Sequence, residues 1–412
     1  MIKKKINKLK KLNKLYNIDG YIIPKNDKYF SEYAFPDRLK IISNFSGSAG
    51  FAIVLKEKNY LFVDGRYTLQ AKIQSGKDFK IFEIPKFYPS SIFKNSKYKI
   101  NIGFDPNLFN NLMLKKYFGN KCNLIPIKKN LIDSIQMAKN KNKKNYFYNL
   151  SHRVTGEKSS SKIKRLIKIL NNKSIDNIFI SAPENVAWLL NLRGNDNPNS
   201  PIPNCRAIIN KNNKIFLFSD LLKVKKIMKF SIYNKISFKT DDQFFSVINN
   251  LNGKSFCIDK NSCSIFYQSL INSKFKILSH EDPCYELKSI KNKLEIKNME
   301  RTHISDGVAL TKFLYWMKNH KLSNLKEIDV ERKLETFRKK NKDYLYPSFN
   351  TIAGSGPNGA IIHYRANKKT NRKINKNDLL LCDSGGQYKF GTTDVTRTIC
   401  FKNQSKRIKD IF

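Results

Sequence analysis

The chain has 412 residues and a formal net charge of +45, with 78 Lys and Arg against 33 Asp and Glu. This length predicts two or three domains, each with a core of its own. The chain contains no run of about 18 apolar residues, which excludes a transmembrane helix, and its basic N-terminus lacks the apolar stretch of a secretory signal.

The lysines are spread over every segment, together with many Asn and Ile residues. This spread is typical of a compositional bias, and no stripe of Arg with stacking aromatic residues occurs, so we expect no nucleic-acid partner. The seven cysteines are scattered, are odd in number and include no CxxC pair. They favour a reducing cytoplasm over a disulfide framework.

The N-terminal segment predicts an amphipathic helix. Its apolar residues recur at helical spacing: Ile2, Ile6, Leu9, Leu12 and Leu15. Such a basic helix can bind a membrane surface. A strand is expected immediately afterwards, however, so the pattern favours packing against the first domain and no membrane partner.

The same order of elements occurs twice, about 150 residues apart, and predicts two similar α/β domains over residues 1–138 and 148–284. The first copy has a strand, a hairpin and a helix, expected at Tyr21–Pro24, 51–64 and from Tyr67 onward. The second has a strand, a helix, a hairpin and a helical segment, expected at 177–180, 183–192, 206–220 and 221–227. Pro183 and Gly194 punctuate the first of these helices in the usual way. The Lys- and Asn-rich segment 139–147 is the expected boundary.

The pattern changes after Asp282-Pro283, where a third domain over 285–412 begins. A long helix is expected over 288–318 and a second over 327–340, followed by strands and turns. The apolar side of the first helix consists of Met299, Leu310, Phe313, Leu314 and Met317. Because an α+β layer needs more elements than these, we expect a domain that is truncated at its C-terminus.

Two aspartates lie in the segment LLLCDSGGQYKFGTTDVTRT, residues 379–398. It predicts two strands, Leu379–Cys382 and Thr392–Thr398, with Asp383 ending the first and Asp394 inside the second. A carboxylate at the end of a buried strand is costly unless a cation binds it, and oxygen ligands suit hard divalent ions such as Mn²⁺. Most Asp residues beside Gly are turn or cap residues, but this pair favours a metal site.

The segment GSGPNG, residues 354–359, fits the pattern of a dinucleotide-binding loop. Such a loop must follow a strand and open a helix. Here Pro357 lies inside it, and residues 360–364 are expected to continue as a strand. We therefore interpret it as a turn that directs His363 into a cleft, and we reject nucleotide binding.

Several long motifs together resemble the Xaa-Pro aminopeptidases of the aminopeptidase P type, in their long three-domain form. PSFNTIAGSGPNGAIIHYR (347–365), TNR (370–372) and the aspartate segment resemble its pita-bread catalytic domain. EYAFPDRLKIISNFSGSAGFAIVL, LFVDGRYTLQA, VAWLLNLRG and DPCYELKSIKN resemble the regions before it. The resemblance covers essentially the whole chain. It implies α/β and α+β architecture: two creatinase-type N-terminal α/β domains, then the beginning of a pita-bread domain.

The resemblance also implies a set of site residues. In the family, two Asp, one His and two Glu hold a dinuclear metal centre, usually manganese. Asp383 matches the terminal ligand, Asp394 the bridging ligand, His363 the catalytic histidine that contacts substrate, and Arg66 a substrate-binding arginine. A lone His is more often structural, and an Arg after Asp-Gly is usually a surface turn residue. The remaining metal ligands of the family would lie beyond Phe412.

The implied activity is the removal of the N-terminal residue from peptides with proline at the second position. Two divalent ions about 3.5–4 Å apart would activate a shared water and polarise the scissile carbonyl. We expect this chain to be an incomplete and inactive fragment of such an enzyme, which in its complete form would be a homodimer. Two alternatives stay open: a pita-bread module that binds peptides or partners without catalysis, and a prolidase- or creatinase-type hydrolase.

Overall fold

The computed structural model describes residues 2–93, 98–136 and 145–412 of the chain, which form two compact units. The first unit consists of Met1–Leu150, Glu157–Asn197 and Pro201–Ile290. The second consists of Ser151–Gly156, Pro198–Ser200 and Lys291–Phe412. Each unit is described by itself.

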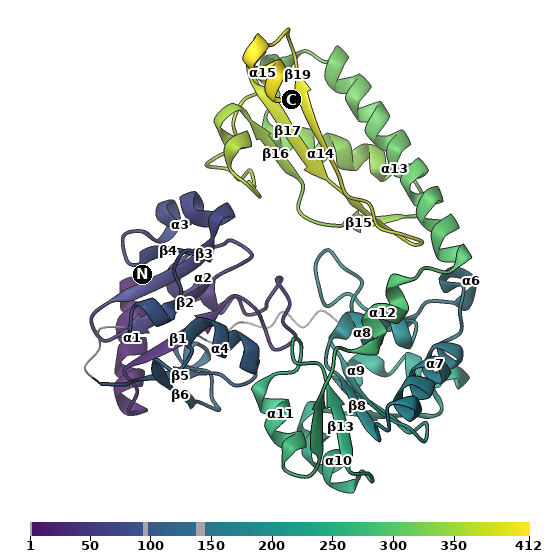
Figure 1. Ribbon diagram of the computed structural model, residues 1–412. Coiled ribbons are helices and arrows are strands. Elements are labelled where there is room, and N and C mark those ends of the chain that lie inside the picture. The colour runs from purple at the N-terminus through teal and green to yellow at the C-terminus, as the bar shows by residue number, and fades with distance from the viewer. Residues whose placement is uncertain (1, 94–97, 137–144) are drawn as a thin grey trace. The chain divides into compact units, whose positions relative to one another are not determined.

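The first unit begins with a six-stranded sheet in the order β4-β3-β2-β1-β5-β6 (Figure 1). Its strands are β1 Gly20–Pro24, β2 Phe51–Leu55, β3 Asn59–Asp64, β4 Lys80–Ile84, β5 Ile100–Phe104 and β6 Cys122–Pro126. Its helices are α1 Ile2–Leu15, α2 Arg38–Ser43, α3 Thr68–Ser75, α4 Asn111–Phe118 and α5 Leu131–Ile135. Alternate residues of β1 enter two separate cores, Tyr21 and Ile23 on one face and Ile22 on the other, as expected for a sheet covered on both sides.

The second sheet of this unit repeats the first in its order, β12-β11-β10-β8-β13-β14. Its strands are β8 Asn177–Ile180, β10 Arg206–Asn210, β11 Ile215–Phe218, β12 Ile236–Lys239, β13 Ser255–Ile258 and β14 Lys276–Ser279. Its helices are α7 Ser159–Asn172, α8 Pro183–Leu189, α9 Leu221–Val224, α10 Phe244–Asn250, α11 Ile265–Asn272 and α12 Pro283–Ser289. In both sheets the central strand pairs antiparallel with the hairpin and parallel with the following strand. The predicted repetition of two α/β domains is therefore confirmed.

One arginine connects the two α/β domains of the first unit. Arg206, at the start of β10, is 2% exposed and lies between two aromatic rings, with its guanidinium carbon 4.2 Å from the centre of Tyr29 and 4.6 Å from that of Tyr267. It donates hydrogen bonds to the Tyr267 hydroxyl and the Lys28 carbonyl oxygen. Because Tyr29 and Lys28 belong to the first domain, this side chain binds the two domains together.

Several local predictions for the first unit need correction. Helix α1 forms as predicted and buries Ile6 and Leu9, but Leu15 is 77% exposed because the helix ends there. Helix α8 ends at Leu189, earlier than predicted, because Leu192–Arg193 forms strand β9 with β7, Tyr148–Asn149. Of the expected boundary 139–147, residues 139–144 lie outside the described residues.

The second unit packs two helices on a three-stranded sheet (Figure 1). Its helices are α6 His152–Thr155, α13 Lys293–Asn319, α14 Glu327–Arg338 and α15 Lys406–Ile411. The sheet has the order β16-β17-β19, and its strands are β16 Ile352–Ser355, β17 Leu379–Ser384 and β19 Val395–Cys400. A separate pair consists of β15 Tyr344–Pro347 and β18 Gly386–Tyr388. These elements pack into an α+β layer, in agreement with the predicted fold class, although they were expected to be too few to form one.

Helix α13 begins later than predicted. Asn292 accepts hydrogen bonds from the backbone N–H groups of Leu294 and Glu295, and the Glu295 side chain accepts one from the Asn292 N–H. This capping box starts a new helix at Lys293. Phe313 and Met317 enter the core as predicted, whereas Met299 is 38% exposed and contributes nothing to it.

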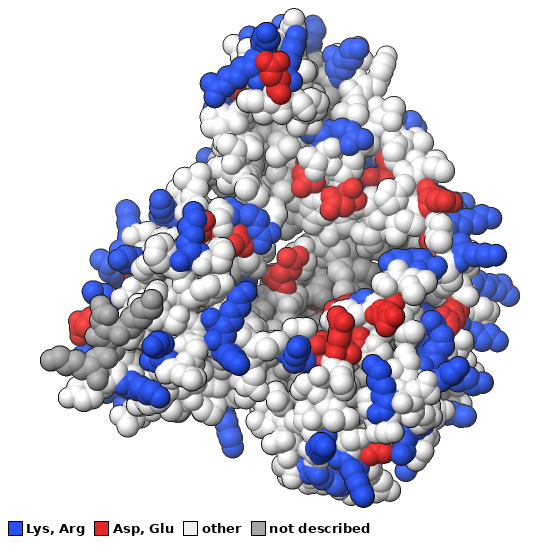
Figure 2. Space-filling model, in the orientation of Figure 1, with Lys and Arg blue, Asp and Glu red and all other residues white. Residues whose placement is uncertain are grey.

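Charge and cysteine usage agree with the dispersed pattern of the sequence. On the face shown in Figure 2, Lys and Arg side chains are scattered over the surface and do not form a single stripe. All seven cysteines are free thiols, and only Cys400 is exposed. Within the described parts of the chain, no helix is long and apolar enough to cross a membrane.

Candidate metal and substrate-binding site

The two aspartates of the C-terminal segment lie near one another in the second unit, close enough for the charge of Asp383 to act on Asp394. Strand β17 alternates, with Cys382 and Ser384 buried and Asp383 half-buried between them. Asp383 lies opposite Thr396 of β19, whose hydroxyl donates a hydrogen bond to Asp383 Oδ1 at 2.8 Å. Asp394 lies two residues before Thr396, just outside β19.

The positions of both aspartates differ slightly from those expected. Asp383 was predicted to end its strand, but β17 continues to Ser384. Asp394 was predicted to lie inside the second strand, but β19 begins one residue later, at Val395. Asp394 therefore lies just before the first residue of β19, and it is exposed.

The electrostatics of this pair suit a cation. Partial burial raises the pKa of the Asp394 carboxyl, and the negative charge of Asp383 raises it further. No ion pair to either carboxylate is found among the residues that the structure describes. Carboxylate oxygens are ligands for hard divalent ions, so the two side chains fit such an ion chemically. Within the described ranges, however, no group of three or more His, Cys, Asp or Glu residues could hold a metal.

The backbone of Thr393, the residue before Asp394, passes close to the residues that follow β17, and this approach fixes where Asp394 lies relative to Asp383. Thr393 and Gly386 exchange hydrogen bonds, and Ser348 Oγ donates to the Thr393 carbonyl oxygen at 2.8 Å. A Cβ atom at Gly385 would lie 2.0 Å from that same oxygen. The neighbouring Gly385 therefore has to be glycine because the backbone of Thr393 passes too closely for any side chain.

A buried ion pair between helices α13 and α14 also interacts with Thr393. It was not among the residues predicted from the sequence. Arg338 of α14 donates two hydrogen bonds to Asp306 of α13, at 2.7 and 3.0 Å. Their side chains are 2% and 4% exposed. The Tyr388 hydroxyl of β18 donates to Asp306 Oδ1 at 2.7 Å. Burial alone would raise the pKa of Asp306, but Arg338, Tyr388 and Thr393 together lower it.

A sequence signal for this pair existed. Asp306 precedes Leu310, Phe313 and Met317 at helical spacing, so it occupies an apolar position of α13. A charged residue at such a position needs a buried partner. The sequence alone does not specify that the partner is Arg338, because the crossing of α13 with α14 determines it.

His363 lies in the same unit as the aspartates but not on a strand. After β16 the chain forms a short 3₁₀ helix, Gly356–Ala360, and then a turn. His363 is exposed and has a φ of +56°, in the left-handed region. The predicted strand over 360–364 is therefore wrong, because this backbone conformation ends extended pairing. The proximity of His363 to Asp383 and Asp394 stays a prediction.

Arg66 belongs to the first unit, in the short 3₁₀ helix Gly65–Tyr67 after β3. Its guanidinium donates two hydrogen bonds to Asp64, at 3.0 and 2.7 Å, and this contact raises the pKa of Arg66. The side chain is still 47% exposed. Arg66 is thus an arginine in a surface turn. Asp64 orients its guanidinium, and about half of its side chain is exposed.

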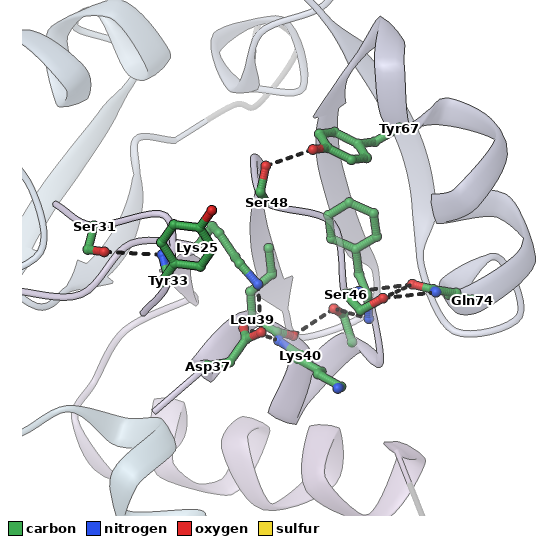
Figure 3. Close-up of polar contacts among 12 residues, drawn as sticks. Lys25, Ser31, Tyr33, Asp37, Leu39, Lys40, Ser46, Ser48, Tyr67 and Gln74 are labelled. Carbon is green, nitrogen blue, oxygen red and sulfur yellow. Dashed lines mark hydrogen bonds and ion pairs between the residues drawn. The ribbon is translucent and has the colours of Figure 1, made fainter. Parts of the chain in front are cut away.

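The surroundings of Arg66 are polar and ordered. The hydroxyl groups of Tyr67, the residue after Arg66, and Ser48 lie 2.7 Å apart (Figure 3). The ring of Tyr67 also lies 5.4 Å from the Arg66 guanidinium carbon. The turn that carries Arg66 is therefore attached to the rest of its domain through Tyr67.

Comparison with known proteins covers the whole chain. Models of the creatinase/prolidase N-terminal domain match residues 5–137 and 138–295, and the model of metallopeptidase family M24 matches residues 297–412. Xaa-Pro aminopeptidase 1 of Dictyostelium discoideum is 33% identical, with 100% of this chain and 69% of that protein covered. A Laccaria bicolor relative named "Probable Xaa-Pro aminopeptidase P" is 31% identical, with 99% and 66% covered. The chain thus spans about two thirds of the length of these relatives.

A solved structure shows the same fold. The X-prolyl aminopeptidase of Caenorhabditis elegans, described as a cytosolic enzyme with a di-nuclear active site, superimposes with a TM-score of 0.91 at 26% identity. The match covers 99% of this chain and 71% of that one. The second unit accordingly has the pita-bread fold, and the first unit has two creatinase-type domains.

We predict that Arg338→Met destabilises the second unit by about 3–5 kcal/mol, because it leaves the Asp306 carboxylate buried without its partner. Urea unfolding followed by Trp316 fluorescence in a Trp188→Phe background would measure this loss, since the chain has two tryptophans. The matched control is Lys339→Met, which removes an exposed pair with Glu335 and should cost below about 0.5 kcal/mol. Equal losses for the two variants would contradict the prediction.

Proposed function

Because the chain belongs to the Xaa-Pro aminopeptidases of metallopeptidase family M24, we propose that the protein is a metal-dependent aminopeptidase. It removes the N-terminal residue from peptides whose second residue is proline. The observation that supports this proposal is the pair Asp383 and Asp394, two carboxylates whose charges interact and which have no ion pair among the described residues. Two such carboxylates can supply part of the ligands that divalent ions require in a hydrolase.

The proposed metal ligands are Asp383, as terminal ligand, and Asp394, as bridging ligand. Two divalent ions, in our proposal Mn²⁺, would supply a water of lowered pKa when bound. The di-nuclear active site described for the C. elegans enzyme supports the number of ions. The exposure of Asp394 supports its role, since a bridging carboxylate must be accessible from two sides.

His363 and Arg66 are the proposed substrate contacts. A Xaa-Pro bond is a tertiary amide without an N–H group, so an enzyme must recognise the proline by the shape of its ring and by groups placed against it. We propose that His363 is one such group, which its exposed position permits. Arg66 would contact the more distant part of longer peptides, with a guanidinium already oriented by Asp64.

The small number of metal-binding oxygens favours metal and peptide binding without catalysis for residues 1–412 by themselves. Two carboxylates offer at most four oxygens, whereas hard cations in such sites need about six ligands each. The absence of any group of three or more metal-binding side chains in the described ranges is consistent with this limit. We therefore propose that these residues alone bind peptide and metal without hydrolysing the peptide. A cytoplasmic location and a homodimeric complete enzyme are part of the same proposal.

We predict that residues 1–412 bind Mn²⁺ weakly, with a dissociation constant of roughly 10⁻⁴–10⁻³ M, the range of exposed oxygen sites with few ligands. Electron paramagnetic resonance of free Mn²⁺ would measure the binding. Asp383→Asn and Asp394→Asn should each reduce it at least tenfold, because each removes one of the two negative charges and one of the four carboxylate oxygens. Asp410→Asn, an exposed aspartate in the same unit, is the control and should have no effect. Unchanged binding in both site variants would rule out this metal site.

A second prediction concerns catalysis. Residues 1–412, supplied with Mn²⁺, should not hydrolyse a Xaa-Pro peptide, because two carboxylates would supply too few of the ligands that two divalent ions need. Chromatography of an Ala-Pro-Ala peptide after prolonged incubation would detect any cleavage. Manganese-dependent turnover that disappears in Asp394→Ala would contradict this prediction, and would require further ligands within the chain.

The third prediction of this section concerns Arg66. In an enzyme form that hydrolyses Xaa-Pro peptides, Arg66→Ala should lower kcat/KM about tenfold for longer peptides and leave Mn²⁺ binding unchanged, since it removes a charged substrate contact and none of the proposed metal ligands. Steady-state kinetics on peptides of two to eight residues would show the length dependence. Lys86→Ala, which removes an exposed lysine paired with Glu83, is the matched control. Loss of metal in Arg66→Ala would identify Arg66 as structural.

A further inference from the structure

Glu327, the first residue of α14, carries a carboxylate with unusual surroundings. It is fully buried, with 0% of its surface exposed. Among the described residues it forms no ion pair with a basic side chain. A buried carboxylate without a cation is costly unless hydrogen bonds satisfy it completely. Its place at the beginning of a twelve-residue helix offsets part of that cost through the helix dipole.

Four groups donate hydrogen bonds to this carboxylate, and all come from one segment. Oε1 accepts from the Ser355 backbone N–H at 2.8 Å and from the Asn358 side-chain amide at 3.0 Å. Oε2 accepts from the Tyr364 hydroxyl at 2.8 Å and from the Arg372 backbone N–H at 2.9 Å. The Glu327 N–H in turn donates to the Arg372 carbonyl oxygen at 3.1 Å. Segment 355–372 is thus bound to one side chain at its beginning, middle and end.

The donor in the middle of the segment is the residue next to His363. Tyr364 is 6% exposed, whereas His363 is exposed. Burial raises the pKa of the Tyr364 phenol to about 12, so the hydroxyl remains protonated and available as a donor. The Asn358 amide also donates to the Tyr364 oxygen, at 2.9 Å. Tyr364 is fixed by its hydrogen bond to Glu327, and His363 has a φ of +56°. Together these fix the backbone from which the imidazole of His363 extends.

We propose that Glu327 is a positioning residue for His363. Its carboxylate accepts hydrogen bonds from four groups of segment 355–372, and these bonds fix the turn that carries the imidazole. The inference rests on the proposed function for the role of His363 in substrate recognition, whereas the attachment of the segment to Glu327 is independent of it. A covalent neighbour held by a buried carboxylate is a means of pre-orienting a side chain that is itself exposed.

The chain offers a matched control in Asp378, a second carboxylate bonded to the same segment. It accepts from Ser355 Oγ at 3.2 Å and from the Arg372 guanidinium at 3.3 Å. Its contacts are longer than those of Glu327, and none of its hydrogen bonds involves residues 356–364. Asp378→Asn therefore perturbs the ends of the segment without releasing Tyr364.

The test is nuclear magnetic resonance of the whole chain with ¹³C-labelled histidine. The chain has five histidines, and His363→Gln assigns the signal of His363. We expect Tyr364→Phe and Glu327→Gln to shift or broaden that signal while the other four stay unchanged. Asp378→Asn should leave it in place. If the His363 signal is the same in Tyr364→Phe as in the unaltered chain, the proposal is overturned. Should Glu327→Gln fail to fold, Tyr364→Phe decides the matter alone.

Kinetics separate this proposal from the proposed function. In an enzyme form that hydrolyses Xaa-Pro peptides, both variants should lower kcat about 10- to 100-fold, as expected when a catalytic group is displaced by about 1 Å. Mn²⁺ binding should be unchanged. If the His363 signal changes while kcat does not, Glu327 positions His363 as proposed, but His363 has no role in the reaction. The proposed function then fails at that residue, and the positioning role stands.

Discussion

The ion pair between Asp306 and Arg338 is the contact on which the second unit depends. It joins α13 to α14 at a point where both side chains are almost completely buried, and Asp306 also accepts from Tyr388 of β18. The influence of Thr393 on the pKa of Asp306 extends the network to the residue before Asp394. A single carboxylate therefore connects two helices, the β18 strand and the backbone that carries a proposed metal ligand.

This arrangement explains why the proposed metal site lies on a rigid part of the fold although both of its aspartates are accessible. Asp383 is fixed by the register of β17 against β19, and its Oδ1 is occupied by the Thr396 hydroxyl. Asp394 follows Thr393, which is held by Gly386 and Ser348. Their separation is thus determined by backbone pairing, and the buried network keeps that pairing in place. Sites built in this way hold their ligands more precisely than sites on free loops.

The architecture was largely predictable from the sequence because its signals are local. The strands at 20–24 and 177–180 and the two hairpins follow from short apolar runs and the turns between them, and their repetition indicated two similar α/β domains. Helix boundaries were less predictable. The start of α13 depends on the reciprocal cap of Asn292 and Glu295, and the end of α8 depends on the pairing of β9 with β7, which is non-local.

The candidate site was predictable only in part, for a physical reason. The aspartates are recognisable because each stands beside an apolar strand. The pairing of Asp306 with Arg338 is not, since it depends on the crossing of two helices. Nor is the contact of Glu327 with Tyr364, the neighbour of His363, which spans 37 positions of sequence. The strand expected at 360–364 failed for the same reason. Its apolar residues suggested extended structure, whereas the hydrogen bonds to Glu327 hold the segment in turns.

The second unit contains three carboxylate sites that differ in how the negative charge is compensated. Asp306 is buried and neutralised by Arg338. Glu327 is buried and satisfied by four donors and a helix N-terminus. Asp383 and Asp394 have neither solution: the charge of Asp383 raises the pKa of the Asp394 carboxyl, and no ion pair to either is found among the described residues. A cation bound by this pair would offset the repulsion between the two charges, which is the electrostatic reason for proposing a metal there.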